Sequence, residues 1–366
     1  RGYAPTDIPA GMLTHLNYAF GLIGPDGRAV LGDPQADIGA APPDEVGPTG
    51  PGGNFGQLRE LKARHPHLRT LISMGGWGGS RGFSDACATA EGRQRLAASC
   101  IELYLTRWPG IFDGIDIDWE YPVCCGLPDN GYRPEDRRNC TLLFAELRRQ
   151  LDALGAATGR RYLLTAALPA GRALPLRTFE LRESAEILDW INVMTYDISG
   201  SGESGLTNFN AALYPTSADP RAGDERLYQN VDGTVRTFLE HGVPPERLVV
   251  GMPFYGRGFT GVPDVDHGLY QPFTGTISAP YRAIVRAYLP RCERFWHEEA
   301  GVPWLYDAAA GLMLSYDDPE AIGRKTDYIV AHGLGGAMFW ELSGDDAGAS
   351  LLRAIASRLR PGAGAA

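Results

Sequence analysis

The sequence lacks the features that would direct it to a membrane or to nucleic acid. No stretch approaches the roughly 18 consecutive apolar residues of a membrane-spanning helix, and no basic-then-apolar leader opens the chain. No cluster of Lys and Arg could follow a phosphate backbone, and the formal net charge is −10. We therefore expect neither nucleic acid nor an anionic membrane as a partner.

The sequence also lacks the paired CxxC spacing of a zinc site, although it contains six cysteines. The even count permits disulfides. Cys87–Cys100 and a pair among Cys124, Cys125 and Cys140 are the nearest in sequence. Free thiols are equally compatible with the sequence.

Short apolar runs alternate with helical patterns along the chain, which is typical of βα units around a parallel sheet. Hydrophobic residues make up 44% and charged residues 21%, so a large core can form. The runs that predict strands are LTHLNYAF (13–20), LRTLISMGG (68–76), FDGIDIDWE (112–120), YLLTAALP (162–169), LDWINVMTY (188–196), RLVVGMPFY (247–255) and GLGGAMFWEL (333–342). The helical patterns are 91–107, 138–155, 228–241, 318–332 and 346–359.

This alternation favours an α/β fold, the closed (β/α)8 TIM barrel. The opening residues read as a loop, so we expect the first barrel strand to be missing from the sequence. Residues 24–56 are rich in Gly, Pro and Asp and predict a long loop. Residues 258–316, after the seventh barrel strand, predict a small inserted α+β module, with 1–257 and 317–366 forming the barrel.

Three acids recur at every second residue in an apolar segment, FDGIDIDWEYP (112–122). Because side chains alternate between the two faces of a strand, Asp116, Asp118 and Glu120 point one way and the apolar residues between them point the other. In a parallel barrel the outer face packs under helices, so we expect the acids to point inward. The apolar residues of the opposite face are Ile115, Ile117 and Trp119.

Inward-pointing charges are costly unless they share protons or hydrogen bonds. A rise of about 3.3 Å per residue puts neighbouring acids about 6.6 Å apart at their Cα atoms, which couples their titrations. We expect Glu120, at the C-terminal end of the strand, to have the raised pKa of a general acid. A turn, a buried hydrogen-bonded pair or a Mg²⁺ or Ca²⁺ site uses similar residues, but metal ligands usually come from loops or several elements.

The segment DGIDIDWEYP resembles the DxxDxDxE signature of the family 18 glycoside hydrolases, the chitinases, with Asp113 as its first acid and Glu120 as its last. The similarity runs from about Leu13 to Trp340, and the other motifs occur in the family's order. These motifs are SMGGW (73–77), MTYD (194–197), PFYGRGF (253–259) and MFWEL (338–342).

The resemblance implies retaining hydrolysis without an enzyme nucleophile. It assigns Glu120 as the acid and then the base, and Asp118 as the partner of the substrate's acetamide. Asp116 tunes Asp118 through proton sharing. Asp113 breaks the period of two, so we expect a structural role for it.

The resemblance also assigns residues that contact the sugar. Tyr196 matches the tyrosine that hydrogen-bonds the acetamide oxygen, and Trp340 matches the hydrophobic floor beneath the sugar, with a plain core tryptophan as the alternative. Trp77 and Phe20 fit aromatic positions along the cleft, although Trp77 could cap the barrel mouth and Phe20 could belong to the core. The remaining substrate-binding candidates are Met194, Asp197, Tyr255 and Arg257.

The sequence therefore predicts a secreted chitinase that acts as a monomer on chitin or chitooligosaccharides and needs no cofactor and no metal. Secretion follows from the family alone. A chitin-binding lectin and an endo-β-N-acetylglucosaminidase on glycoprotein glycans are the alternatives. The presence of Glu120, Asp118 and Tyr196 argues against the lectin, and the inserted module with Trp340 favours chitin.

Overall fold

The computed structural model describes residues 2–39, 46, 50–199 and 205–359. The chain forms two compact units. Unit 1 comprises Arg1–Leu168 and Leu176–Ile191, and unit 2 comprises Pro169–Pro175 and Asn192–Ala366. Among the described residues, no helix is both long and apolar enough to cross a membrane.

Unit 1 is built on a sheet in which the strands lie in the order β5-β4-β3-β1-β2. All neighbours are parallel except the β1–β2 pair. The four predicted strands of this part of the chain are confirmed. The strands are β1 (His15–Ile23), β2 (Ala29–Val30), β3 (Arg69–Gly75), β4 (Gly114–Asp118) and β5 (Leu163–Pro169).

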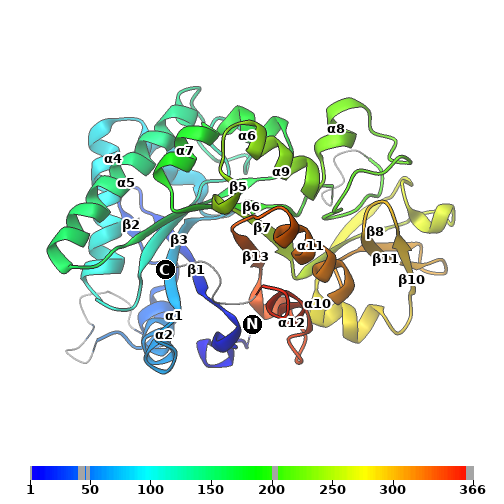
Figure 1. Cartoon of the computed structure of the whole chain (residues 1–366), viewed down its shortest axis with the longest axis horizontal. Coiled ribbons are helices and arrows are strands. Elements are labelled where there is room, and N and C mark those ends of the chain that lie inside the picture. The colour runs from blue at the N-terminus through cyan, green and yellow to red at the C-terminus, as the bar shows by residue number, and fades with distance from the viewer. Residues whose placement is uncertain (1, 40–45, 47–49, 200–204, 360–366) are drawn as a thin grey trace. The chain divides into compact units, whose positions relative to one another are not determined.

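The helices of the first half of the chain separate these strands. The long helices α4 and α5 lie side by side (Figure 1), and the Gln150 Nε2 atom of α5 donates to the Gln94 carbonyl of α4 at 3.2 Å. Both helices were predicted, and α4 continues into a wider π-helical turn at Ile101–Thr106. The helices are α2 (Gly53–Arg64), α3 (Phe83–Cys87), α4 (Ala90–Cys100), α5 (Asp136–Thr158), α6 (Ala173–Thr178) and α7 (Leu181–Ile187).

Residues 24–56 are more structured than the predicted loop. They contain β2, the short helix α1 (Pro34–Ile38) and the start of α2. The Asp33 carboxylate caps α1 by accepting from the Ala36 amide at 3.0 Å. This local hydrogen bond stabilises a helical turn where a loop was predicted. Residues 40–45 and 47–49 of the same segment lie outside the described residues.

Unit 2 contains the remaining predicted strands of the parallel sheet. Strand β6 (Trp190–Met194) runs through the point where the chain enters this unit, and β7 (Leu248–Pro253) pairs in parallel with β13 (Gly336–Trp340). The predicted helices are also confirmed. The helices of this unit are α8 (Gly223–Tyr228), α9 (Val231–Glu240), α10 (Tyr281–Ala283), α11 (Pro319–Ala331) and α12 (Ser350–Ala356).

A second, antiparallel sheet of unit 2 begins at Tyr255, slightly before residue 258, where the sequence places the start of the inserted module. Its order is β10-β11-β12-β8-β9. Its buried side chains Phe259 and Trp304 form a hydrophobic cluster with Phe209. The strands are β8 (Tyr255–Thr260), β9 (Gly275–Pro280), β10 (Glu293–His297), β11 (Val302–Asp307) and β12 (Leu312–Ser315). The exact limits of an inserted module stay a prediction.

Candidate active site

Strand β4 separates apolar from acidic side chains as the sequence predicts. The residues Ile115, Ile117 and Trp119 are buried, and the Trp119 ring stacks on Phe83 of α3 with the ring centroids 5.1 Å apart. The strand ends at Asp118, so Glu120 lies in the turn that follows and not within the expected strand 112–120. The helix-facing apolar row thus anchors the strand directly before Glu120.

Asp116 is held by hydroxyl groups from both neighbouring strands. The Ser73 Oγ atom of β3 donates to its Oδ2 at 2.6 Å, and the Thr165 Oγ1 atom of β5 donates to its Oδ1 at 2.5 Å. The register places these three residues opposite one another across the sheet. Both carboxyl oxygens of a buried acid are therefore satisfied, which fixes its orientation.

Asp118 lies in an environment that disfavours a charged carboxylate more strongly. Its side chain is buried, and its Oδ1 atom has no hydrogen-bond partner among the described residues. Burial raises its pKa well above the ordinary value, and the nearby carboxyls of Glu120 and Asp116 raise it further. A raised pKa was expected from the sequence for Glu120, and that expectation stays a prediction; the structure shows a raised pKa for Asp118 as well.

The main chain of Glu120 is fixed on both sides of the residue. Its amide donates to the Ser80 Oγ atom at 2.9 Å, and its carbonyl accepts from the Asn130 Nδ2 atom at 3.0 Å. The residue as a whole is buried, with 9% of its surface exposed. Ser80 and Asn130 could not be predicted from the sequence, because both lie outside the motif and no local pattern connects them to Glu120.

Asp113 has the structural role that was expected. Its carboxylate accepts from the Thr70 amide at 2.9 Å, from the Lys62 Nζ atom at 2.5 Å and from the Arg160 Nη2 atom at 2.9 Å. These contacts lie just before the N-terminal end of β4, away from the turn that carries Glu120. Asp113 therefore anchors the strand and does not join the row of acids.

The aromatic candidates of unit 1 differ in exposure. Trp77 is 50% exposed, so it is not part of the core. Phe20 is half-buried and lies over Gly76, where an added Cβ atom would come within 2.5 Å of the Phe20 ring. Gly76 has a φ of 76°, so both its backbone and its close contact require glycine.

Strand β6 of unit 2 leads into the predicted tyrosine. The Tyr196 hydroxyl contacts the Met338 Sδ atom of β13 at 3.7 Å, and Met194 is buried. A Cβ atom at Gly251 would lie 2.9 Å from the Tyr196 ring, so the absence of a side chain there makes room for the tyrosine. Tyr196 itself is only half-buried and can reach a ligand.

A charged pair follows Tyr196. The Arg257 Nε atom donates to the Asp197 Oδ1 atom at 2.6 Å, and this bond raises the pKa of Arg257. The guanidinium also lies over the Tyr255 ring at 5.2 Å, and the Tyr255 and Tyr196 rings meet edge to face at 6.1 Å. The structure thus joins four of the residues predicted in this unit into one cluster.

Trp340 lies at the end of β13 and is 38% exposed, which excludes the alternative of a plain core tryptophan. Its carbonyl accepts from the Phe254 amide at 2.8 Å, and the neighbouring Phe339 stacks on Phe254 with the ring centroids 4.3 Å apart. The strand end is therefore fixed while the indole remains accessible. An accessible aromatic ring of this kind suits contact with the apolar face of a sugar.

Within residues 2–39, 46, 50–199 and 205–359, no group of three or more His, Cys, Asp or Glu side chains is arranged to hold a metal ion.

Comparison with known proteins identifies the relatives of this chain. The model of the glycosyl hydrolases family 18 matches residues 1–345. Chitinase A1 from Niallia circulans is 40% identical over 94% of this chain and 54% of its own length. Chitinase C from Streptomyces lividans is 34% identical over 93% of this chain and 54% of its own length. The chain thus spans about half the length of these curated relatives.

Solved structures agree with this result. Chitinase ChiA74 from Bacillus thuringiensis has a TM-score of 0.89 and 37% identity, over 99% of this chain and 68% of that one. A family 18 N-acetylglucosaminidase from Paenibacillus barengoltzii has a TM-score of 0.83 and 34% identity, over 98% of this chain and 96% of that one. These likenesses confirm the predicted fold class, a (β/α)8 barrel with an inserted sheet.

Proposed function

We propose that this chain, which belongs to the glycosyl hydrolases family 18, hydrolyses β-1,4 bonds in chitin and chitooligosaccharides with retention of configuration. One observation carries the proposal: a buried Asp118 with a raised pKa is followed by Glu120, whose backbone is clamped on both sides. A carboxyl that resists ionisation next to a positioned second carboxyl suits acid catalysis of glycoside cleavage.

Glu120 acts first as the acid and then as the base. It donates its proton to the glycosidic oxygen while the bond from that oxygen to the anomeric carbon breaks. The carbonyl oxygen of the substrate's own acetamide attacks the same carbon and forms a cyclic oxazolinium ion. Glu120 then takes a proton from the water that opens this ring, so the sugar leaves with its original configuration.

Asp118 stabilises the cationic intermediate. Burial and the adjacent acids raise the pKa of its carboxyl and thus favour the protonated form in the resting enzyme. A positive charge that forms on the acetamide favours the carboxylate instead. Asp116, oriented by Ser73 and Thr165, shares the displaced proton.

The residues of unit 2 contribute substrate contacts. We assign the Tyr196 hydroxyl to the acetamide oxygen and the Trp340 indole to the apolar face of the sugar. The Asp197–Arg257 pair presents charged hydrogen-bonding groups beside Tyr255. Phe20, Trp77 and Met194 complete the proposed set of sugar contacts, of which Trp77 is the most exposed.

The proposed enzyme is a secreted monomer that needs no cofactor, with chitin or chitooligosaccharides as its substrate. Secretion fits a polymer that lies outside the cell. Residues 258–316 form the inserted module of this proposal, and their aromatic-rich sheet would deepen a groove that grips several sugars.

A second candidate function is release of terminal N-acetylglucosamine. The likeness to the Paenibacillus barengoltzii N-acetylglucosaminidase, which extends over 96% of that chain, favours this alternative over the lectin and the glycan endoglycosidase. The same acids would serve both reactions, so only the length of the preferred substrate distinguishes them.

The test measures release of a fluorophore from glycosides of one, two and three N-acetylglucosamine units, with a glycoprotein glycan as a further substrate. A chitinase has its highest kcat/KM on the two- and three-unit glycosides, and an inhibitor that mimics the oxazolinium ion blocks it. Preference for the one-unit glycoside would establish the second candidate. Binding to chitin without release from any glycoside would contradict both and indicate a lectin.

A further inference from the structure

The segment after Glu120 folds back onto the main chain of that residue. An added Cβ atom at Gly126 would lie 2.1 Å from the Glu120 carbonyl oxygen, so the two backbones touch. The Asn130 side chain donates to the same oxygen at 3.0 Å. Residues 121–135, called the 121–135 loop from here on, therefore form a closed turn whose neck is the peptide that carries Glu120.

The far end of the 121–135 loop is tied to α3. The Arg133 guanidinium donates to the Ser84 Oγ atom and to the Asp85 Oδ1 atom, each at 2.6 Å. The buried Asp136 carboxylate accepts from the same Ser84 hydroxyl at 2.6 Å. The loop is thus anchored at its neck and at its far end, and a further constraint acts within the segment between Glu120 and Gly126.

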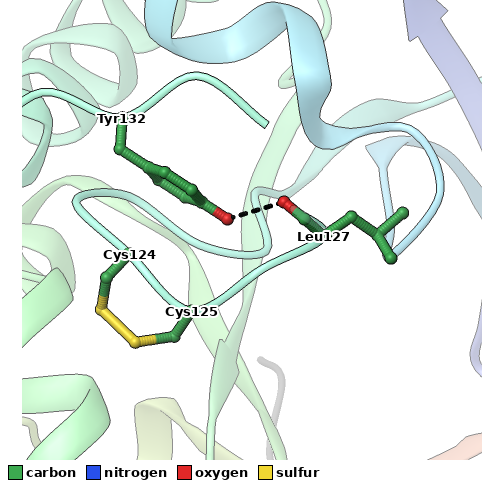
Figure 2. Close-up of a disulfide and its surroundings, with 4 residues drawn as sticks. All are labelled: Cys124, Cys125, Leu127 and Tyr132. Atoms are coloured by element: carbon green, nitrogen blue, oxygen red, sulfur yellow. Dashed lines mark hydrogen bonds between the residues drawn. A yellow bond between two sulfur atoms is a disulfide. The ribbon is translucent and has the colours of Figure 1, made fainter. Parts of the chain in front are cut away.

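A disulfide between adjacent residues supplies that internal constraint. Cys124 and Cys125 are bonded to each other, directly before Gly126 (Figure 2). The bond closes a small ring around the peptide that joins the two residues. On the other side of the loop, the Tyr132 hydroxyl donates to the Leu127 carbonyl at 3.0 Å (Figure 2).

The backbone beside the disulfide adopts conformations that need such a constraint. Val123 and Cys125 have φ angles of 73° and 74°. This left-handed region is unfavourable for residues other than glycine, and most of all for a β-branched valine. Such conformations persist only where the surroundings impose them.

We propose that the Cys124–Cys125 disulfide is a positioning element for Glu120 and makes catalysis sensitive to thiols; this inference rests on the proposed function. With the bond intact, the loop returns to the Glu120 carbonyl in a single arrangement. Without it, Val123 and Cys125 relax from the left-handed region, and the contact at Gly126 loosens. Glu120 then loses its alignment with the glycosidic oxygen, while the residues that bind sugar remain in place.

The reductant is a small dithiol, and the chemistry balances. One thiolate of the reagent attacks a sulfur of the disulfide, which breaks the S–S bond and forms a mixed disulfide. The second thiol of the reagent displaces the protein sulfur and closes the oxidised ring of the reagent. Two electrons and two protons pass to Cys124 and Cys125, which become thiols. Cys125 is exposed and Cys124 is half-buried, so the reagent can reach the bond.

The first experiment treats the full chain with dithiothreitol and follows kcat and KM on the two-unit glycoside. Iodoacetamide labelling and mass spectrometry show which thiols have formed. Burial raises the pKa of the Cys87, Cys100 and Cys140 thiols, so these react slowly, and mass spectrometry separates the labelled loop thiols from the partly exposed Cys292. We expect kcat to fall about tenfold, KM to change by less than about twofold, and both constants to recover on reoxidation.

Two variants accompany this measurement. Cys124→Ser with Cys125→Ser gives the low kcat of the reduced enzyme and no response to the reductant. Cys292→Ser, which removes a partly exposed free thiol elsewhere, responds like the unmodified chain. An unchanged kcat in enzyme whose loop is fully alkylated would overturn the proposal. A change in KM alone would also overturn it, because it would indicate a substrate contact and not a positioning role.

Hydrogen exchange provides a readout that depends neither on activity nor on the variants. Reduction should raise exchange about tenfold in peptides that cover residues 119–131, because the Glu120 amide and the loop neck open more often. Peptides of α5 should not change. Equal exchange before and after reduction would contradict the proposal. If the chain cleaved no chitooligosaccharide, the proposed function would fail, while hydrogen exchange would still decide whether the disulfide holds Glu120.

Discussion

The Asp118 carboxyl lies where its ionised form is disfavoured by burial and by two neighbouring acids. The strand period predicted that three acids share one face, but it could not predict which of them carries the raised pKa. That depends on depth and hydrogen bonding. Asp116 receives two hydroxyl donors, whereas Asp118 has an oxygen without a partner among the described residues.

Asp118→Asn tests this shift through stability. Below the ordinary pKa of 3.8, both folded and unfolded chains hold the proton. As the pH rises above it, the unfolded chain ionises while the folded chain keeps its proton, so the wild type loses stability until the raised pKa is passed. The asparagine variant avoids this loss. We expect the urea midpoint of the variant to rise relative to that of the wild type as the pH increases above about 4.

The exposed Asp264→Asn is the control for this series, because its carboxyl lies in water in both states. A difference between Asp118→Asn and the wild type that stayed constant over the whole pH range would show that the pKa of Asp118 is not raised.

At the scale of single elements, the sequence predicted the strands and long helices because their periodicity is local. Strand β4 and helix α5 follow from apolar spacing alone. The end of β4 at Asp118 and the short helix α1 could not be predicted, because they depend on distant partners and on a cap. The turn Ser80–Gly82 is the clearest case, since its hydroxyl meets Glu120 from a separate segment.

Ser80→Ala removes the hydroxyl that accepts from the Glu120 amide. The loss of this bond should cost about 1 kcal/mol in the positioned state, which corresponds to a kcat that is about fivefold lower, with little change in KM. Steady-state kinetics on the two-unit glycoside measure both constants.

Ser184→Ala is the matched control, because its buried hydroxyl has no hydrogen-bond partner among the described residues. We expect wild-type kinetics from it. Wild-type kcat in Ser80→Ala would show that the turn does not position Glu120.

At the scale of the whole molecule, the order of the motifs along the chain was sufficient to predict the family and the barrel. Contacts between side chains that lie far apart in the sequence could not be predicted, because neither composition nor local pattern shows which distant residues meet in the fold. The sequence left the cysteine pairing open, and the structure bonds Cys124 to Cys125 while Cys87 and Cys100 remain free. It also gave no sign of the Lys325–Asp317 ion pair, which is fully buried in unit 2.

Lys325→Met tests how much that ion pair contributes to the stability of the fold. The substitution leaves the Asp317 carboxyl buried without its partner, so we expect a loss of about 3–5 kcal/mol in the free energy of unfolding. Adding Asp317→Asn removes the stranded charge and should recover much of this loss. Urea unfolding of the single and double variants measures both values. Equal stability of the wild type and Lys325→Met would contradict a structural role for the pair.

The most direct test of the whole account is the rate of Glu120→Gln on the three-unit glycoside. Removal of the general acid should lower kcat by about 10²–10⁴-fold, while calorimetry shows that the oligosaccharide still binds. Glu91→Gln, an exposed substitution on α4, should retain the wild-type rate. If Glu120→Gln cleaved the glycoside at the wild-type rate, Glu120 would not be the proton donor and the proposed mechanism would be wrong.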